Sequence, residues 1–153
     1  MHLPKCAEYY TAAYFALIVS QNSPSSVIYR HIGTTIITKP KFKNLTLKKE
    51  EFQSDTDIHS YDLVMGLLPC DATEAIISAS CKAQKDFYIA MCGCVHFQGY
   101  DPFGYYTPHM YQEYVIQLAQ QMLKEYDNGE LEVDFLPDEY GIDYPILYNR
   151  KKW

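Results

Sequence analysis

Two short apolar runs, residues 63–68 and 87–91, flank a stretch in which small and apolar residues recur at helical spacing. Neither run alternates with polar residues, which is typical of parallel strands that are covered on both faces. The stretch between them begins at Asp71 and runs to about Gln84, with Glu74 at the spacing of a capping box. The pattern predicts a β-α-β unit whose strands are adjacent, parallel and joined by a right-handed crossover.

The first 60 residues predict a helix followed by strands. Residues 5–20 place apolar side chains on most sides of a helix, so we expect a helix that packs on the sheet. Residues 27–32 are rich in β-branched side chains and predict a strand. Residues 45–52 predict another strand, and the charges in its middle place it near an edge of the sheet.

A second helix is predicted after the β-α-β unit. Thr107 precedes Pro108, and proline is favoured at the first position of a helix. Apolar residues then recur on one face to about Tyr126, and Asn128 with Gly129 stops the helix.

Two more strands, residues 131–135 and 144–149, are predicted to close the sheet as an antiparallel hairpin. The 153 residues suit one hydrophobic core, and no linker divides them, so residues 1–153 are expected to form a single domain. The predicted fold class is α/β. We expect a Rossmann-like, mainly parallel sheet with helices on both faces and a C-terminal antiparallel hairpin.

Composition and charge limit the partners and the cellular compartment that we expect for the protein. The net charge of −6 argues against general nucleic-acid binding. The apolar run at residues 12–19 is too short to cross a bilayer, and no secretory leader is recognised, so we expect a cytoplasmic protein that binds no membrane. In that compartment its five cysteines would be reduced.

The most chemically distinctive residues follow the two strands of the β-α-β unit. Because open α/β sheets bind ligands at the carboxyl ends of their strands, a cleft is expected there. The residues that would line its substrate side, including two from a Gly/Pro/Tyr-rich loop, are Cys92, Cys94, His96, Tyr100 and Tyr105.

Three interpretations of the thiols at this edge remain open. They can pack as small apolar groups, form a reactive or redox site, or ligate a metal together with His96. The C-x-C-x-H spacing lacks the usual spacer of zinc sites, so no metal is expected.

Two segments carry a more specific pattern. An Asp-Leu-Val strand at residues 62–64 runs into LPCDATE at residues 68–74, and the next strand ends in CGCVH at residues 92–96. With the closing hairpin, which resembles the reversed hairpin of the same proteins, the pattern extends over residues 61–153. This part of the chain resembles the cysteine-rich branch of the Rossmann-like S-adenosylmethionine-dependent methyltransferases.

The resemblance implies a site for S-adenosylmethionine, with an acidic residue on the adenine amino group. The residues that it places on this cofactor are Asp55, Leu68, Pro69, Cys70 and Asp71. Members of the family hold the donor mainly through a Gly-rich turn after their first strand. This chain has no G-x-G before residue 61, where Gly33 stands alone, so donor binding is expected to be weak or lost.

The leading functional hypothesis is a methyltransferase-like domain that is truncated or catalytically inactive, with a cleft at the carboxyl ends of its strands. Whether it is an enzyme stays open; if active, it would be an S-adenosylmethionine-dependent methyltransferase. One alternative is a non-catalytic binding or assembly module on a Rossmann-like scaffold, and another is a Cys/His metal or thiol-redox site. The sequence names neither the small molecule nor the protein that it would bind, and leaves a homo-oligomer open.

Overall fold

The computed structural model describes the sheet, two helices and the turns next to them. The described residues are 15–19, 26–30, 45–48, 52–67, 69, 72–91, 107–137 and 143–150.

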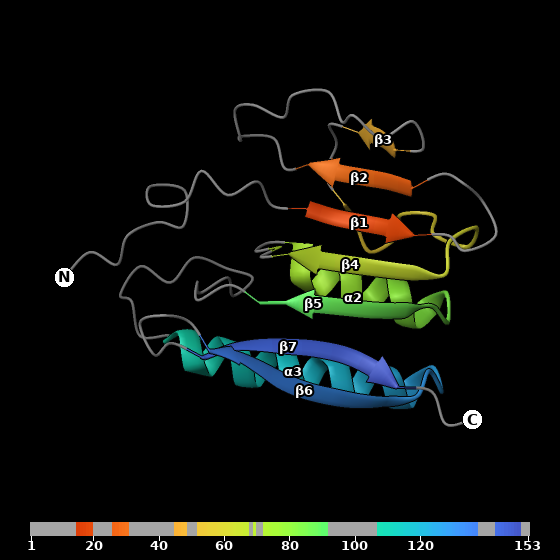
Figure 1. The fold of residues 1–153 in the computed structure, drawn as a ribbon. Coiled ribbons are helices and arrows are strands. Elements are labelled where there is room, and N and C mark those ends of the chain that lie inside the picture. The colour runs from red at the N-terminus through yellow and green to blue at the C-terminus, as the bar shows by residue number, and fades with distance from the viewer. Residues whose placement is uncertain are drawn as a thin grey trace.

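The strands that the structure describes form one seven-stranded sheet in the order β3-β2-β1-β4-β5-β7-β6 (Figure 1). They are β1 (Phe15–Val19), β2 (Ser26–Arg30), β3 (Leu45–Lys48), β4 (Leu63–Leu67), β5 (Asp86–Ala90), β6 (Glu130–Pro137) and β7 (Asp143–Arg150). The predicted α/β class is thus confirmed. The strand expected near an edge, β3, is the end strand of the described sheet.

The sheet is mixed rather than mainly parallel, and on this point the prediction was wrong. Strands β2–β3 and β4–β5 pair in parallel, whereas β1–β2, β1–β4, β5–β7 and β6–β7 pair antiparallel. The physical reason is the connection between β1 and β2. Residues 20–25 are too few for the crossover that parallel neighbours need, so the chain turns back on itself.

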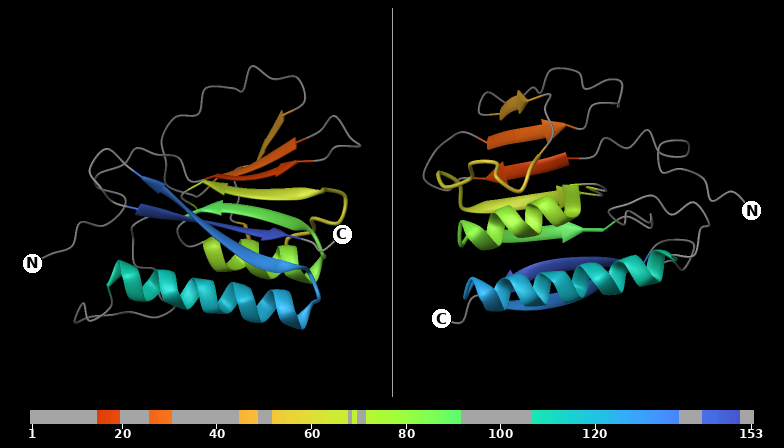
Figure 2. Two further views of the ribbon diagram at one scale, coloured as in Figure 1. Left: turned by 60° about the horizontal axis from the view of Figure 1, so that its bottom comes forward. Right: turned by 180° about the vertical axis from the view of Figure 1, so that it is seen from behind.

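The β-α-β unit is present as predicted. Strands β4 and β5 are parallel neighbours, with Val64 opposite Phe87 and Gly66 opposite Ile89. Helix α2 (Thr73–Lys82) connects them, and the view from behind in Figure 2 shows that the crossover is right-handed. The C-terminal hairpin is also confirmed, with β7 lying between β5 and β6 and antiparallel to both.

Both helices that the structure describes lie on the same face of the sheet. Helix α2 covers β4 and β5, and α3 (Pro108–Glu125) covers β6 and β7 (Figure 2). The expected helices on both faces are therefore not found among the described residues.

Strand β1 corrects another prediction, because Phe15–Val19 is a strand inside the segment expected to be a helix. The five residues Phe-Ala-Leu-Ile-Val are apolar throughout, so their pattern fits a buried strand as well as a buried helix. Pairing with β2 and β4 on its two sides decides the outcome. Residues 5–14 and 20 lie outside the described part of the chain.

The core lies between the sheet and the two helices. On the helix-facing side of the strands, Val64, Phe87, Ile89 and Leu147 are at most 1% exposed. The helices contribute Ile76, Ile77, Val115, Ala119 and Leu123, all equally well buried. Complete burial of an aliphatic or Phe side chain stabilises the folded state by roughly 1.5–3 kcal/mol. This layer is what fixes α2 and α3 on the sheet.

The two helix starts differ. Helix α3 begins at Pro108 with Thr107 as its N-cap, as predicted, and ends next to Tyr126. Helix α2 begins at Thr73, and its N-cap Ala72 makes no side-chain cap. Asp71 lies outside the described residues, so the capping box with Glu74 stays a prediction.

Candidate functional site

Most of the predicted site residues lie outside the part of the chain that the structure describes. These are Leu68, Cys70, Asp71, Cys92, Cys94, His96, Tyr100 and Tyr105. Asp55 and Pro69 are described, and so are the first turns of α2 and α3. The site can therefore be built from its framework.

The structure places Asp55 and Pro69 at opposite edges of the sheet. Pro69 follows the carboxyl end of β4, just before α2. Asp55 lies in a loop that packs against Lys82 and Ala83 at the other end of α2, where it lines a shallow depression of about 250 Å³. A ten-residue helix is about 15 Å long. Asp55 and Pro69 are thus not neighbours.

The loop at the amino edge is held by its own hydrogen bonds. The Thr56 hydroxyl oxygen accepts from the Gln53 amide at 2.8 Å, and the Asp57 carboxylate accepts from the His59 amide at 3.1 Å. Ile58 anchors the loop, since it is only 1% exposed. These contacts give Asp57 a structural role in the turn.

At the carboxyl edge, the turn after β4 depends on Gly66. A Cβ atom on Gly66 would lie 3.0 Å from Cδ1 of Ile76 and 3.0 Å from Cγ of Pro69. The buried Pro69 in turn accepts a 2.9 Å hydrogen bond from the Ala72 amide through its carbonyl. The absent side chain lets α2 and the Pro69 turn approach the strand closely.

Glu74 and Tyr114 join the two helices at the same edge. The Tyr114 hydroxyl donates to Oε2 of Glu74 at 3.2 Å, linking the first turn of α2 to the second turn of α3. Burial raises the pKa of the Glu74 carboxyl, and the Tyr114 hydrogen bond opposes this rise. Burial and the Glu74 charge both raise the pKa of Tyr114.

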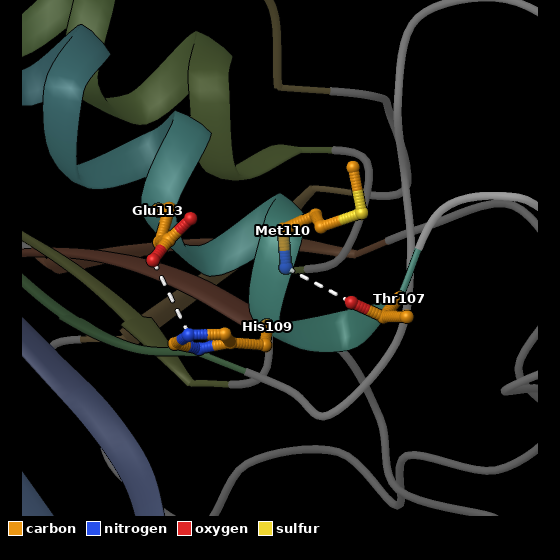
Figure 3. Close-up of polar contacts among 4 residues, drawn as sticks. All are labelled: Thr107, His109, Met110 and Glu113. Carbon is orange, nitrogen blue, oxygen red and sulfur yellow. Dashed lines mark hydrogen bonds and ion pairs between the residues drawn. The ribbon is translucent and has the colours of Figure 1, made fainter.

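The start of α3 adds more polar groups at this edge (Figure 3). The Thr107 hydroxyl oxygen accepts from the Met110 amide at 3.2 Å, and Nε2 of His109 lies 3.2 Å from Oε1 of Glu113. The side chains of His109 and Glu113 are 78% and 59% exposed. Such an exposed pair contributes little to stability, roughly 0–1 kcal/mol. Met110, which is 44% exposed, is the apolar group next to them.

Sequence reasoning missed a buried polar network near the amino edge. Asn149 accepts from the Phe87 amide at 2.7 Å and donates to the Asn128 carbonyl at 3.0 Å. Asn128 donates to the Lys85 carbonyl at 2.8 Å. The amides therefore tie β5, β7 and the end of α3 together. The sequence feature that could have indicated this network is Asn149, a polar residue at a strand position where an apolar residue would be expected.

Cys81 belongs to the same region and is fully buried. Burial raises the pKa of its thiol to about 12, and a hydrogen bond with Asn128 opposes the rise. A thiol in this state is an inert packing group at neutral pH. Its side chain is fully shielded from solvent.

The chemistry of the described carboxyl edge is that of hydrogen bonding and proton exchange. Its Glu74 carboxyl and Tyr114 hydroxyl can bind a polar ligand group, and a carboxyl of raised pKa is suited to general acid–base work. Within the described residues, no group of three or more His, Cys, Asp or Glu side chains could hold a metal ion. None of the helices described is long and apolar enough to span a membrane.

Comparison with known proteins supplies no relative. No family model, no curated protein and no solved structure matches this chain.

Proposed function

We propose that the protein is a methyltransferase-like domain that acts as a binding module, with S-adenosylmethionine binding weak or lost. Two features of the fold support a methyltransferase-like, Rossmann-like ancestry. The β4-α2-β5 unit is parallel with a right-handed crossover, and β7 lies reversed between β5 and β6. Both are what the resemblance over residues 61–153 implies.

We infer the loss of donor binding from the direction of β1. A donor half built on the family's plan needs a strand, a Gly-rich turn, a helix and a second parallel strand. Here β1 is antiparallel to both β2 and β4. The chain between β1 and β2 has no room for a helix and no glycine. The displaced position of Asp55 supports the same conclusion.

A second candidate, an active methyltransferase, is favoured by the Glu74–Tyr114 pair. Its carboxyl of raised pKa lies at the carboxyl edge, where an acceptor would need a base. In-line methyl transfer also requires that donor and acceptor be held together. This candidate therefore depends on donor binding, whereas the binding module does not.

Thermal unfolding with S-adenosylmethionine and S-adenosylhomocysteine distinguishes the binding module from an active methyltransferase. A ligand at 100 times its dissociation constant stabilises by about 2.7 kcal/mol, or roughly 5–10 °C for a chain of this size. We expect no such shift at about 1 mM ligand, because for weak binding this concentration is well below 100 times the dissociation constant. A shift of this size would favour the enzyme, and Asp55→Ala would then show whether Asp55 contacts the donor.

A further inference from the structure

The sheet face opposite the helices carries an unexpected row of side chains. Register places Met65 of β4 opposite Tyr88 of β5, Tyr88 opposite Tyr148 of β7, and Tyr148 opposite Glu132 of β6. These positions alternate with the buried, helix-facing Val64, Phe87 and Leu147. Figure 1 looks onto this face, and no described helix lies over it.

Two tyrosines form the centre of the row. The rings of Tyr88 and Tyr148 are stacked with centroids 5.7 Å apart and an interplanar angle of 22°. Tyr88 is 38% exposed, and Leu67 on the same face is 56% exposed. The hydroxyl of Tyr148 donates to Oδ2 of Asp134 at 3.0 Å, which holds the second ring in place. The pair is thus an ordered aromatic surface that solvent reaches.

The charges beside the tyrosines are mainly negative. Glu132 and Asp134 lie on this face of β6, and Arg150 of β7 forms an exposed ion pair with Glu132 at 3.9 Å. The pKa of Tyr148 is raised first by the hydrogen bond to Asp134, then by burial, and further by the charges of Asp134 and Glu132, while Arg150 lowers it. The aromatic pair therefore lies in a negative potential.

We propose that this face, which we call the tyrosine face (Met65, Leu67, Tyr88, Tyr148, Glu132 and Asp134), binds an arginine-rich segment of a partner protein. A guanidinium group stacks on a tyrosine ring and is attracted by its π-electrons. Carboxylates at the rim of the ring pair then accept its N–H groups. The exposed Leu67 and the half-buried Met65 offer apolar surface to the methylene stem of the same side chain.

Charge complementarity selects this occupant over the others. A nucleic acid would bring phosphates to a face lined by Glu132 and Asp134, in a chain with net charge −6. A second copy that met this face across a two-fold axis would bring its own carboxylates near the same row. The tyrosine face is built from strand residues opposite the helices and shares none of the residues proposed for donor binding.

Fluorescence anisotropy with the full chain tests the proposal. The probe is a fluorescein-labelled peptide of six Arg-Gly repeats, and a Glu-Gly peptide of equal length is the negative probe. Titrations at about 50 mM and about 300 mM salt separate short-range stacking from screened attraction. The variants are Tyr88→Leu, Tyr88→Phe and Asp134→Asn. Glu125→Gln removes an exposed carboxylate from the end of α3, away from the tyrosine face, and is the matched control.

The Arg-Gly peptide is expected to bind and the Glu-Gly peptide is not. Tyr88→Leu and Asp134→Asn should each weaken binding by about three-fold, while Tyr88→Phe and Glu125→Gln leave it unchanged. Thermal unfolding of each variant checks that the fold is kept. Absence of binding at low salt overturns the proposal, and so does an equal loss in Asp134→Asn and Glu125→Gln. Concentration-dependent self-association that Tyr88→Leu abolishes also overturns it, since a second copy would then be the occupant.

Discussion

At the scale of single residues, Gly66 shows how the absence of a side chain shapes the site. A glycine inside an apolar strand indicates close approach of another segment, and here Ile76 and Pro69 fill that space. Gly66→Ala should destabilise the fold by about 1 kcal/mol, because overpacking costs about 1–3 kcal/mol and reduced unfolded-state entropy offsets part of it. Urea unfolding measures the change.

The matched double variant isolates the cause. Ile76→Val removes the Cδ1 atom that the new methyl group would meet at 3.0 Å. Gly66→Ala should therefore cost less in the Ile76→Val background than in the wild type. Equal costs in both backgrounds would show that the contact with Ile76 is irrelevant.

Glu74 provides a prediction on pH. Because burial raises its folded-state pKa, Glu74 contributes stability below its unfolded pKa, and that contribution is lost as pH rises through the folded pKa. Glu74→Gln does not titrate, and its amide oxygen can still accept from Tyr114. The variant should gain stability relative to the wild type between pH 4 and pH 7. The gain should stay below about 1 kcal/mol, because the carboxyl is partly exposed.

Denaturant unfolding at both pH values measures this difference. Glu125→Gln, which changes an exposed carboxyl at the end of α3, is the matched control. A Glu74→Gln variant that loses relative stability on going from pH 4 to pH 7 would reverse the sign assigned here.

Cys81 is expected to resist alkylation in the folded protein. Because burial raises the pKa of its thiol to about 12, very little thiolate is present at pH 8, and burial blocks the reagent as well. Iodoacetamide treatment followed by peptide mass spectrometry gives the rate for the peptide that contains Cys81. Rapid labelling without denaturant would contradict the burial.

At the scale of elements, the start of α3 is the best defined cap. The Thr107 hydroxyl satisfies the Met110 amide, which the helix itself leaves unpaired. Thr107→Ala should cost about 1 kcal/mol, and Thr107→Ser should keep most of that stability. Thermal unfolding should show a loss of roughly 2–4 °C for alanine only. Equal melting temperatures for both variants would remove the cap from the account.

The local elements could be predicted from the sequence where the chain marks them clearly. Strands β4 and β5 are continuous apolar runs. Helix α3 has apolar residues at helical spacing after its Thr107–Pro108 start. Strand β1 carried no mark that separates strand from helix, and its direction depends on pairing with β4, far along the chain. Sequence patterns report neighbours within a few residues, so such pairings escape them.

In the candidate site, too, local sequence patterns predict some features, whereas others depend on contacts between distant residues. The carboxyl edge was predictable because a parallel β-α-β unit always creates one. The Glu74–Tyr114 hydrogen bond joins residues 40 positions apart, and the Tyr88–Tyr148 stack joins neighbouring strands that are distant in sequence. Both depend on how α2 meets α3 and on β7 entering between β5 and β6. No local pattern in the chain encodes either arrangement.

At the scale of the whole molecule, the sheet has two different faces. One face holds both described helices and the core, and the other carries the tyrosine face. Strands β4 to β7 form the predicted parallel β-α-β unit and closing hairpin, whereas β1 and β2 form an antiparallel pair. The molecule thus combines a parallel β-α-β unit with an antiparallel β1–β2 pair in one mixed sheet.

Isothermal titration of the full chain with S-adenosylmethionine tests this account most directly. We expect no saturable heat at micromolar concentrations of S-adenosylmethionine, and the same result with S-adenosylhomocysteine. One donor molecule bound per chain with a micromolar dissociation constant would contradict it, because the antiparallel β1 would then be no obstacle to the donor site.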